Sequence, residues 1–376
     1  MKLNLLVCLI AVAQCGSICH SASAKATRAV TPQMHYDTRL APALGDALRR
    51  ENAADFKALL DQGADPNTRL LDDNAIPREK PTPILVTASG LDIKIVKLLL
   101  DAGANPNLTQ EKGSSTALMM AASVGNLPIC QILVSRGANI NAQDGNGYTP
   151  LLEAAHFGKT QVAEFLVSKG AFLYAIDKKT YMTPLMEAAY VGCWEIFRVL
   201  FAVGANLKYK NDMGRTPLME AATTVSPETA ADVRGKIKIV KLLLAQGVDV
   251  NAHDLNGQTA AMNVLASPVF GDDSAPGSDA AAANLEILKI LVSRGANIDA
   301  RDSEGKSLFL QAARYGNTDI VKYLLTKGVD VNQRDDDGKT ALMLASVNSH
   351  ENTINALLKS GAKVTLQNYH GEVALP

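Results

Sequence analysis

The chain has 376 residues, an almost balanced charge and few aromatic side chains. It carries 37 basic and 38 acidic residues, so we do not expect it to bind nucleic acid or an anionic membrane, both of which call for a marked basic excess. Aromatic residues make up 5% of the chain. A packed core must therefore consist mainly of Ala, Leu, Val and Ile, a composition that suits closely packed helices.

The N-terminal residues have the pattern of a cleavable secretory signal. Lys2 supplies a short positive start, and an apolar stretch from Leu3 to Ala13 follows it. Ala22-Ser23-Ala24 fits the small-x-small site of signal peptidase, so we predict a signal peptide of residues 1–24. The apolar stretch is shorter than the roughly 20 residues that a membrane anchor needs. The pattern predicts a periplasmic or secreted protein that is not inserted in a membrane after cleavage; an uncleaved N-terminus is the alternative.

A Thr-Pro-Leu-like tripeptide recurs along the rest of the chain. Most intervals between its copies are 33 or 34 residues, and two are longer, at 43 and 48. Such a fixed period indicates a stack of similar units. The copies begin at Thr82, Thr116, Thr149, Thr183, Thr216, Thr259, Ser307 and Thr340.

Each part of the repeated pattern has a physical role. Thr can cap a helix N-terminus, and Pro in the first turn removes an N–H that would have no partner. Ala pairs such as Ala154-Ala155 let a second helix approach closely. That second helix carries apolar residues at helical spacing, as in Ile320, Val321, Leu324 and Leu325. A glycine such as Gly328 then takes the left-handed conformation that ends the helix.

A unit of helix, turn, helix and hairpin loop in 33 residues resembles the ankyrin repeat, from about Leu44 to the C-terminal end. The segments GYTPLLEAAHFG (147–158) and GRTPLMEAAT (214–223) are close to the pattern of that family. The resemblance implies an all-α solenoid of about nine stacked units. We therefore predict an N-terminal linker over 25–40 and an ankyrin-repeat domain over 41–376. The His that follows Thr-Pro-Leu in the family is replaced by side chains expected only to pack: Met119, Leu152, Met186, Met219, Met262, Leu310 and Met343.

Single positions support further expectations. The outer repeats place Asp55 and Thr353 where other units have an aliphatic residue, as a water-facing end requires. Cys130 falls at a core position, whereas Cys193 lies at a turn and is expected to be more accessible. The two cysteines are two repeats apart, too far for a disulfide. We also expect a monomer.

Three segments break the regular spacing. Residues 68–81 lengthen the first loop between repeats, and the sixth and seventh units carry extra residues within 223–236 and 264–284. The last two insertions fall between the helices of adjacent units, so we expect them at the same edge. They form either a flap over a partner site or a tolerated surface segment.

Candidate contact residues lie at the first helix of each unit. Glu153, Glu187 and Glu220 occupy equivalent positions and would form an acidic ladder that favours a basic segment of a partner; alternatively they only complement the helix dipoles. Aromatic and arginine side chains follow at the helix ends that line the concave face in this family. The predicted partner-binding residues are Tyr148, Glu153, His156, Phe157, Glu187, Tyr190, Val191, Glu220, Arg314 and Tyr315.

Signals for catalysis or cofactor binding are weak. Sequences such as Gly158-Lys159-Thr160 imitate the end of a phosphate loop, but the required glycine five residues earlier is absent. The histidines are dispersed, so we expect no metal and no cofactor. We predict a non-catalytic scaffold that binds a partner protein outside the cytoplasm. The alternatives are an exported effector acting on a host protein, and an enzyme whose site is built by the two long insertions of the sixth and seventh units. The only candidate catalytic residues there are Asp272, Asp273 and Asp279.

Overall fold

A computed structural model describes residues 36–70, 82–88, 93–111, 113–223, 233–265 and 279–374. The predicted signal peptide, most of the 68–81 segment and most of both later insertions lie outside these residues. The folded unit comprises Asp37–Pro376. It begins within the predicted linker, because a short 3-10 helix, η1 (Thr38–Leu40), precedes the first α-helix and the Asp37 amide donates to the Gly63 carbonyl.

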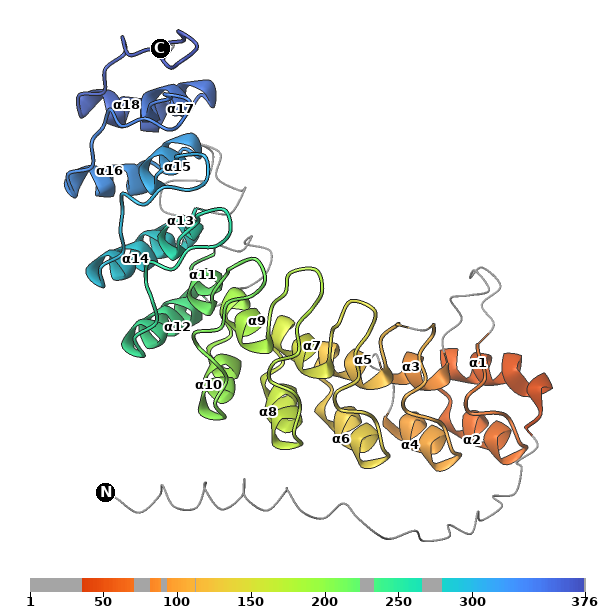
Figure 1. Cartoon of the computed structure of the whole chain (residues 1–376). Helices are drawn as coiled ribbons and strands as arrows, with labels where there is room; N and C mark the ends of the chain where they lie inside the picture. Colours follow the sequence, from red (N-terminus) through yellow and green to blue (C-terminus); the bar gives the residue numbers. More distant parts are fainter. Residues whose placement is uncertain are drawn as a thin grey trace, which may run out of the picture. The chain divides into compact units, whose positions relative to one another are not determined.

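Within the described residues, eighteen α-helices form nine consecutive pairs, which we call repeats 1 to 9 (Figure 1). This confirms the predicted all-α solenoid. The first helices are α1 (Ala41–Arg49), α3 (Pro83–Ala88), α5 (Ala117–Val124), α7 (Pro150–His156), α9 (Pro184–Val191), α11 (Pro217–Ala222), α13 (Ala260–Asn263), α15 (Leu308–Arg314) and α17 (Ala341–Val347). The second helices are α2 (Ala53–Asp61), α4 (Ile93–Asp101), α6 (Leu127–Ser135), α8 (Thr160–Ser168), α10 (Trp194–Ala202), α12 (Val233–Ala245), α14 (Asp279–Ser293), α16 (Thr318–Thr326) and α18 (Glu351–Lys359).

The first helices start where the repeated threonine predicts. In repeats 3 to 9 the hydroxyl of the Thr or Ser cap accepts a hydrogen bond from the amide three residues later, as from Leu152 to Thr149 at 3.2 Å. In two repeats the methionine at that third position also takes part. Met119 Sδ accepts from the Thr116 amide at 3.3 Å, and Met343 Sδ does the same for Thr340. The expectation that these side chains only pack was therefore wrong for Met119 and Met343, since a thioether sulfur is a weak acceptor.

Loops between repeats are joined by asparagine side chains. Asn107 Oδ1 accepts from the Asn139 amide at 2.7 Å while its Nδ2 donates to the Gly137 carbonyl at 2.9 Å. Asn251 makes the same pair of bonds to the loop of the next repeat. Because each bond links residues at least 30 positions apart, the ladder fixes the register between neighbouring loops.

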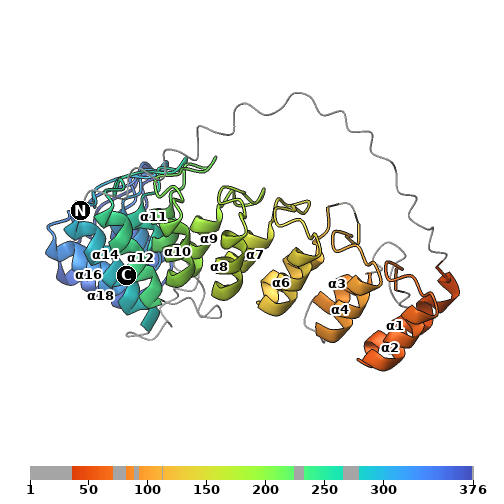
Figure 2. The same cartoon turned by 90° about the horizontal axis from the view of Figure 1, so that it is seen from below.

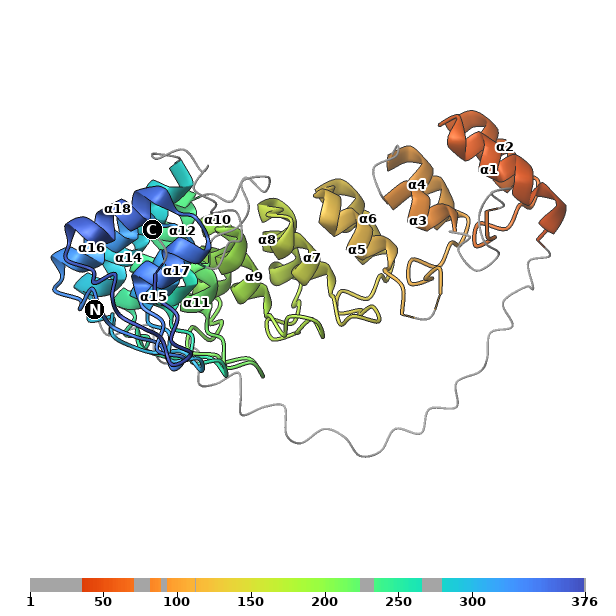
Figure 3. The same ribbon diagram turned by 90° about the horizontal axis from the view of Figure 1, so that it is seen from above.

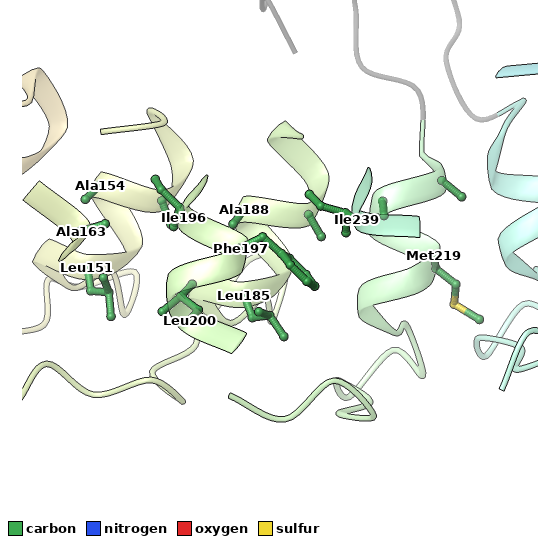
Figure 4. Close-up of a cluster of buried hydrophobic side chains, with 14 of the residues drawn as sticks. Leu151, Ala154, Ala163, Leu185, Ala188, Ile196, Phe197, Leu200, Met219 and Ile239 are labelled. Carbon is green, nitrogen blue, oxygen red and sulfur yellow. The ribbon is translucent and has the colours of Figure 1, made fainter. Parts of the chain in front are cut away.

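The helices stack in two rows, first helices on first helices and second helices on second helices (Figures 2 and 3). Small Ala side chains such as Ala154 and Ala188 lie between them, together with Phe197, Leu200 and Ile239 (Figure 4). These residues belong to one continuous cluster of buried apolar side chains. Cys130 is part of this cluster, as predicted, and Cys193 is half-buried; both are free thiols. Burial raises the pKa of the Cys130 thiol to about 12.

Two sequence expectations need correction at the ends and at the insertions. Asp55 is exposed as expected, but Thr353 is buried and its hydroxyl lies 2.8 Å from that of Thr318. Thr353 therefore joins repeats 8 and 9 rather than facing water. The extra residues of repeats 6 and 7 do lie between paired helices, but part of each insertion lengthens the second helix: α12 has 13 residues and α14 has 15, against 9 in α8 and α10.

Candidate functional site

The predicted contact residues of repeats 4 and 5 form one group. Tyr148 precedes α7, and His156 and Phe157 follow one another at its end. The His156 ring makes edge-on contacts with Tyr148 and with Phe157, at centroid distances of 6.3 and 4.9 Å. Phe157 is 51% exposed, whereas Tyr148 and His156 are half-buried. The group thus presents an aromatic surface whose inner half is fixed by packing.

A buried carboxylate holds this group in place. Glu187, on α9, is only 1% exposed, and its Oε2 lies 3.1 Å from His156 Nδ1 on the neighbouring repeat. The hydrogen bond to Glu187 raises the pKa of His156 against the opposing effect of burial. Burial also raises the pKa of the neighbouring Glu153 to about 7. Burial and hydrogen bonding on this part of the surface thus shift both an imidazole and a carboxyl group toward their protonated forms.

The third acidic residue of the predicted ladder lies in a separate cluster. Glu220 is 2% exposed and forms a two-point contact with Arg215, at 2.6 Å from Nε to Oε1 and 3.0 Å from Nη2 to Oε2. The same guanidinium donates to Thr223 Oγ1 at 3.1 Å and lies 3.7 Å from Asp254 in the next repeat. Arg215 thus links two repeats.

A buried lysine from the insertion of repeat 6 completes this cluster. Lys236 is almost fully buried, donates to the Thr223 carbonyl, and has its Nζ 5.5 Å from the centre of the Tyr190 ring. Burial lowers the pKa of Lys236 to about 7, with Glu220 acting in the opposite direction. Tyr190 is half-buried, and burial followed by the nearby Glu220 and Glu187 raises its pKa.

These contacts correct the idea of an exposed acidic ladder. Glu187 and Glu220 are buried and paired with basic groups of the protein itself, and Glu153 is half-buried. A carboxylate that has an internal partner and no exposed surface cannot attract a basic segment directly. Neither Arg215 nor Lys236 was among the site residues predicted from the sequence. Arg215 could have been noticed because it directly precedes the cap Thr216, but nothing in the sequence marked Lys236 as buried.

The remaining predicted residues are divided between two places. Val191 is half-buried beside Tyr190 at the end of α9. Arg314 and Tyr315 lie in repeat 8, where the guanidinium carbon is 5.9 Å from the Tyr315 ring centre. Arg314 is exposed and borders a cavity of about 690 Å³ that Leu344 and Val347 also line. The structure therefore does not bring Arg314 and Tyr315 together with the residues of repeats 4 to 6.

Metal-binding clusters and membrane-spanning helices are both absent from the described residues. In those residues, His, Cys, Asp and Glu side chains nowhere gather in a group of three or more that could hold a metal ion. None of the helices in the described part of the chain combines the length and apolar character needed to cross a membrane.

Comparisons with known proteins match ankyrin repeats over most of the chain. Models of ankyrin repeats match residues 44–144, 84–177 and 278–368 in sets of three copies, and residues 213–255 as a single repeat. Human ankyrin repeat domain-containing protein 17 is 39% identical over 70 residues, or 18% of this chain and 3% of that protein. A fowlpox virus ankyrin repeat protein is 26% identical over 191 residues, covering 51% of this chain and 96% of the viral one.

The human relatives are much longer than this chain: the matched region spans about 3% of the length of each. Among solved structures, the human ASB11 ankyrin repeat domain is similar with a TM-score of 0.52 and 24% sequence identity. That similarity covers 65% of this chain and 98% of the ASB11 domain. At this identity the likeness concerns the fold alone.

Proposed function

The chain belongs to the ankyrin-repeat family, and on that premise we propose that it is a non-catalytic scaffold that binds a partner protein outside the cytoplasm. Ankyrin repeats indicate a protein–protein interaction scaffold, and no enzyme family is indicated by the comparisons. The observation that carries the proposed site is the aromatic group of Tyr148, His156 and Phe157, exposed at its tip and fixed at its base by Glu187.

The physical argument rests on preorganisation. Aromatic side chains dominate the energies of protein interfaces, and a side chain already held in position loses little conformational entropy on binding. Phe157 supplies the exposed apolar area, while the ring of His156 is oriented by Glu187 beneath it. We propose that a partner places an apolar side chain against Phe157 and a polar group near His156 and Glu153.

The adjoining cluster in repeats 5 and 6 supports the same surface. Tyr190 covers Lys236, which in turn lies next to the Arg215–Glu220 pair. Since Glu220 and Lys236 are buried, we propose that they keep the end of α9 rigid and that only Tyr190 and Val191 reach the partner. The surface that results is aromatic at its centre, in place of the basic-segment site expected from the sequence.

The proposed location outside the cytoplasm rests on the N-terminal pattern. Expression of the full chain with a C-terminal tag in a bacterial host tests it. Cleavage after Ala24 predicts that the exported protein begins at Lys25, which N-terminal sequencing of the periplasmic fraction would show. Recovery of an uncleaved chain in the cytoplasm would contradict the proposal.

Photo-crosslinking tests the surface. A photoreactive phenylalanine analogue at Phe157 is expected to capture a partner from the native compartment, whereas the same analogue at Leu358, which is 41% exposed in repeat 9, is not. His156→Ala and Tyr190→Ala, each without the analogue, are expected to weaken retention of that partner on the immobilised protein. Equal capture from both positions, or equal retention by all variants, would overturn the assignment.

A further inference from the structure

Aromatic residues are concentrated in repeats 4 and 5. Eleven of the 18 aromatic residues in the chain lie between Tyr148 and Tyr209. Most of these are buried or half-buried, but Phe172 and Tyr174 are 62% and 56% exposed. They lie in the loop after α8, whereas the proposed partner site lies at the first helices α7 and α9.

The repeat itself shows what this loop ordinarily contains. The second residue after the helix-ending glycine is Asn or Asp in repeats 1 to 3 and 5 to 8, as at Asn139 and Asn206. Its side-chain oxygen accepts from the amide two residues later, at 3.0 Å from Asn141 and 2.9 Å from Lys208. Phe172 stands at this position in repeat 4 and cannot accept such a bond. Repeat 4 therefore lacks the side-chain hydrogen bond that Asn or Asp forms at this position in other repeats.

Tyr174 links two repeats through its hydroxyl group, but this link does not explain why its ring is exposed. It replaces the ladder asparagine, and its hydroxyl donates to the Gly204 carbonyl at 3.1 Å, as Asn107 Nδ2 does to Gly137. Tyr174 is two residues from Phe172 along the chain, and its hydroxyl reaches the next repeat. There Val203, at the end of α10, is 49% exposed. Phe172, Tyr174 and Val203 are named here the outer aromatic patch.

Two lysines flank the outer aromatic patch. Lys169 precedes Phe172 by three residues, and Lys208 occupies the position of Tyr174 in the following loop. Both are exposed, and neither has a carboxylate partner among the ion pairs of the described residues. In repeat 3 the residue equivalent to Lys169 is Arg136, which does pair with a carboxylate, Asp101, at 2.6 Å. The Lys169 ammonium lies 5.9 Å from the centre of the Phe165 ring, a contact that leaves its charge without a neutralising carboxylate.

A small cavity extends the surface beyond Lys208. It has a volume of about 170 Å³ and lies between this loop and the next one. Apolar side chains such as Leu207 and Val248 line it together with Lys208, Lys210 and one carboxylate, Asp249. Next to the apolar surface of these loops, lysines therefore outnumber the single acidic side chain.

We propose that the outer aromatic patch binds an extended acidic segment of a second protein, in which carboxylates alternate with apolar side chains. The apolar side chains pack on Phe172, Tyr174 and Val203, while the carboxylates meet Lys169 and Lys208. Neighbouring stacked repeats are about 8–10 Å apart, and an extended chain rises roughly 3.3 Å per residue. A segment of a few residues is therefore long enough to bridge the two lysines.

A pair of labelled synthetic peptides tests this assignment by fluorescence anisotropy on the full chain. One peptide alternates Leu and Phe with Asp and Glu; the other has Lys in place of every acid. We expect the acidic peptide alone to bind, with an affinity that falls as salt is added. Failure of the acidic peptide to bind, or equal binding of both peptides, would overturn the proposal.

Substitutions to the residues of neighbouring repeats give matched variants. Phe172→Asn is expected to weaken binding of the acidic peptide about tenfold, the scale on which interface aromatics act, without lowering Tm, because it restores the hydrogen bond found in other repeats. Charge reversal in Lys169→Glu with Lys208→Glu is expected to abolish binding. If both variants keep the affinity of the wild type for the acidic peptide, the peptide does not bind at the outer aromatic patch.

Two controls distinguish binding at this patch from binding at the first helices and from self-association. Phe157→Ala, in the proposed partner site, is expected to leave peptide binding unchanged; loss of binding in that variant would place the peptide on the first helices instead. Sedimentation of the wild type and of Phe172→Asn tests whether a second copy of the chain covers the patch. A dimer found for the wild type but not for Phe172→Asn would show that a second copy of the chain covers the patch, and would overturn the proposal of an acidic partner.

Discussion

Repeats 6 and 7 are each linked to the following repeat by the residue before the helix cap, but with different chemistry. In repeat 6 the residue before the cap, Arg215, reaches the hairpin carboxylate of the next repeat, Asp254. One repeat later Gln258 occupies the place of Arg215 and donates to Asp302 Oδ2 at 3.0 Å. Two neighbouring repeats can therefore be bridged either by a guanidinium, as in Arg215, or by an amide, as in Gln258.

The difference lies in what surrounds the bridge. Asp302 Oδ2 also accepts from Gln311 Nε2 at 2.7 Å, so a carboxylate and two neutral amides suffice in repeats 7 and 8. The bridge of repeat 6 adds a buried Glu220 and borders the buried Lys236. Since the fold does not require these extra charges, we attribute them to the neighbouring surface rather than to stability.

The largest effect is expected from breaking the charged bridge of repeat 6. Glu220→Leu leaves Arg215 without the carboxylate that it contacts at two points, and removal of one partner from a buried pair costs about 3 kcal/mol of the free energy of unfolding. Urea unfolding followed by circular dichroism measures the loss. Arg215→Leu with Glu220→Leu is the control and is expected to recover most of it. A loss below about 1 kcal/mol in Glu220→Leu would show that this bridge contributes no more to stability than the amide bridge of repeats 7 and 8.

Lys236 is expected to make stability depend on pH above neutrality. Its pKa is about 7 in the folded protein against an ordinary 10.5, so the unfolded chain binds more protons between these values and stability rises with pH across that window. We expect a gain of about 1–2 kcal/mol between pH 7 and pH 9, measured by urea unfolding at each pH. Lys236→Met should flatten this dependence. An unchanged slope in that variant would mean that Lys236 keeps its charge on folding.

Glu153 is expected to act in the opposite direction below neutrality. Burial raises its pKa from 4.5 to about 7, so the folded protein binds more protons in that range and stability falls as pH rises through it. In Glu153→Gln this fall should be smaller by about 1 kcal/mol, since the group is only half-buried. Thermal unfolding at pH 5 and pH 7 measures the difference. Glu153 also helps to raise the pKa of His156, so part of the difference between the two proteins comes from His156, and it has the same sign.

The smallest effect is expected from the amide bridge of repeats 7 and 8. Gln311→Leu removes one of two donors to Asp302 Oδ2, while Gln258 still donates. The expected loss is about 0.5 kcal/mol, at the low end for a single hydrogen bond, because the carboxylate keeps its other amide donor. The same urea experiment measures it beside Glu220→Leu. A larger loss from Gln311→Leu would remove the contrast between the two repeats.

The repeated motif made most of the fold predictable. Thr149 and its equivalents fix where each first helix begins, because a hydroxyl cap and the following turn are local interactions. The breaks in spacing also placed the two insertions after α11 and α13, although the end of each insertion forms the first part of α12 or α14. The family assignment followed from the same local signals and is confirmed by the matched repeat models.

The candidate site was only partly predictable for a physical reason. Tyr148, His156 and Phe157 are close in sequence, so their grouping follows from one helix. Whether Glu187 is an exposed acid or a buried partner of His156 depends on the stacking of one repeat on another. The exposure of Phe172 likewise depends on what the neighbouring loop leaves uncovered.

The sequence by itself determined the architecture: a period of 33 residues, a cap at each start and a glycine at each end specify helix pairs that must stack. Only the tertiary structure decided which charged side chains are buried and which partners they have. Glu220, Arg215 and Lys236 look like ordinary surface residues in the sequence, and stacking takes Glu220 and Lys236 out of water and leaves Arg215 largely covered. Burial sets the pKa of Lys236, because desolvation depends on every neighbouring atom rather than on the local sequence.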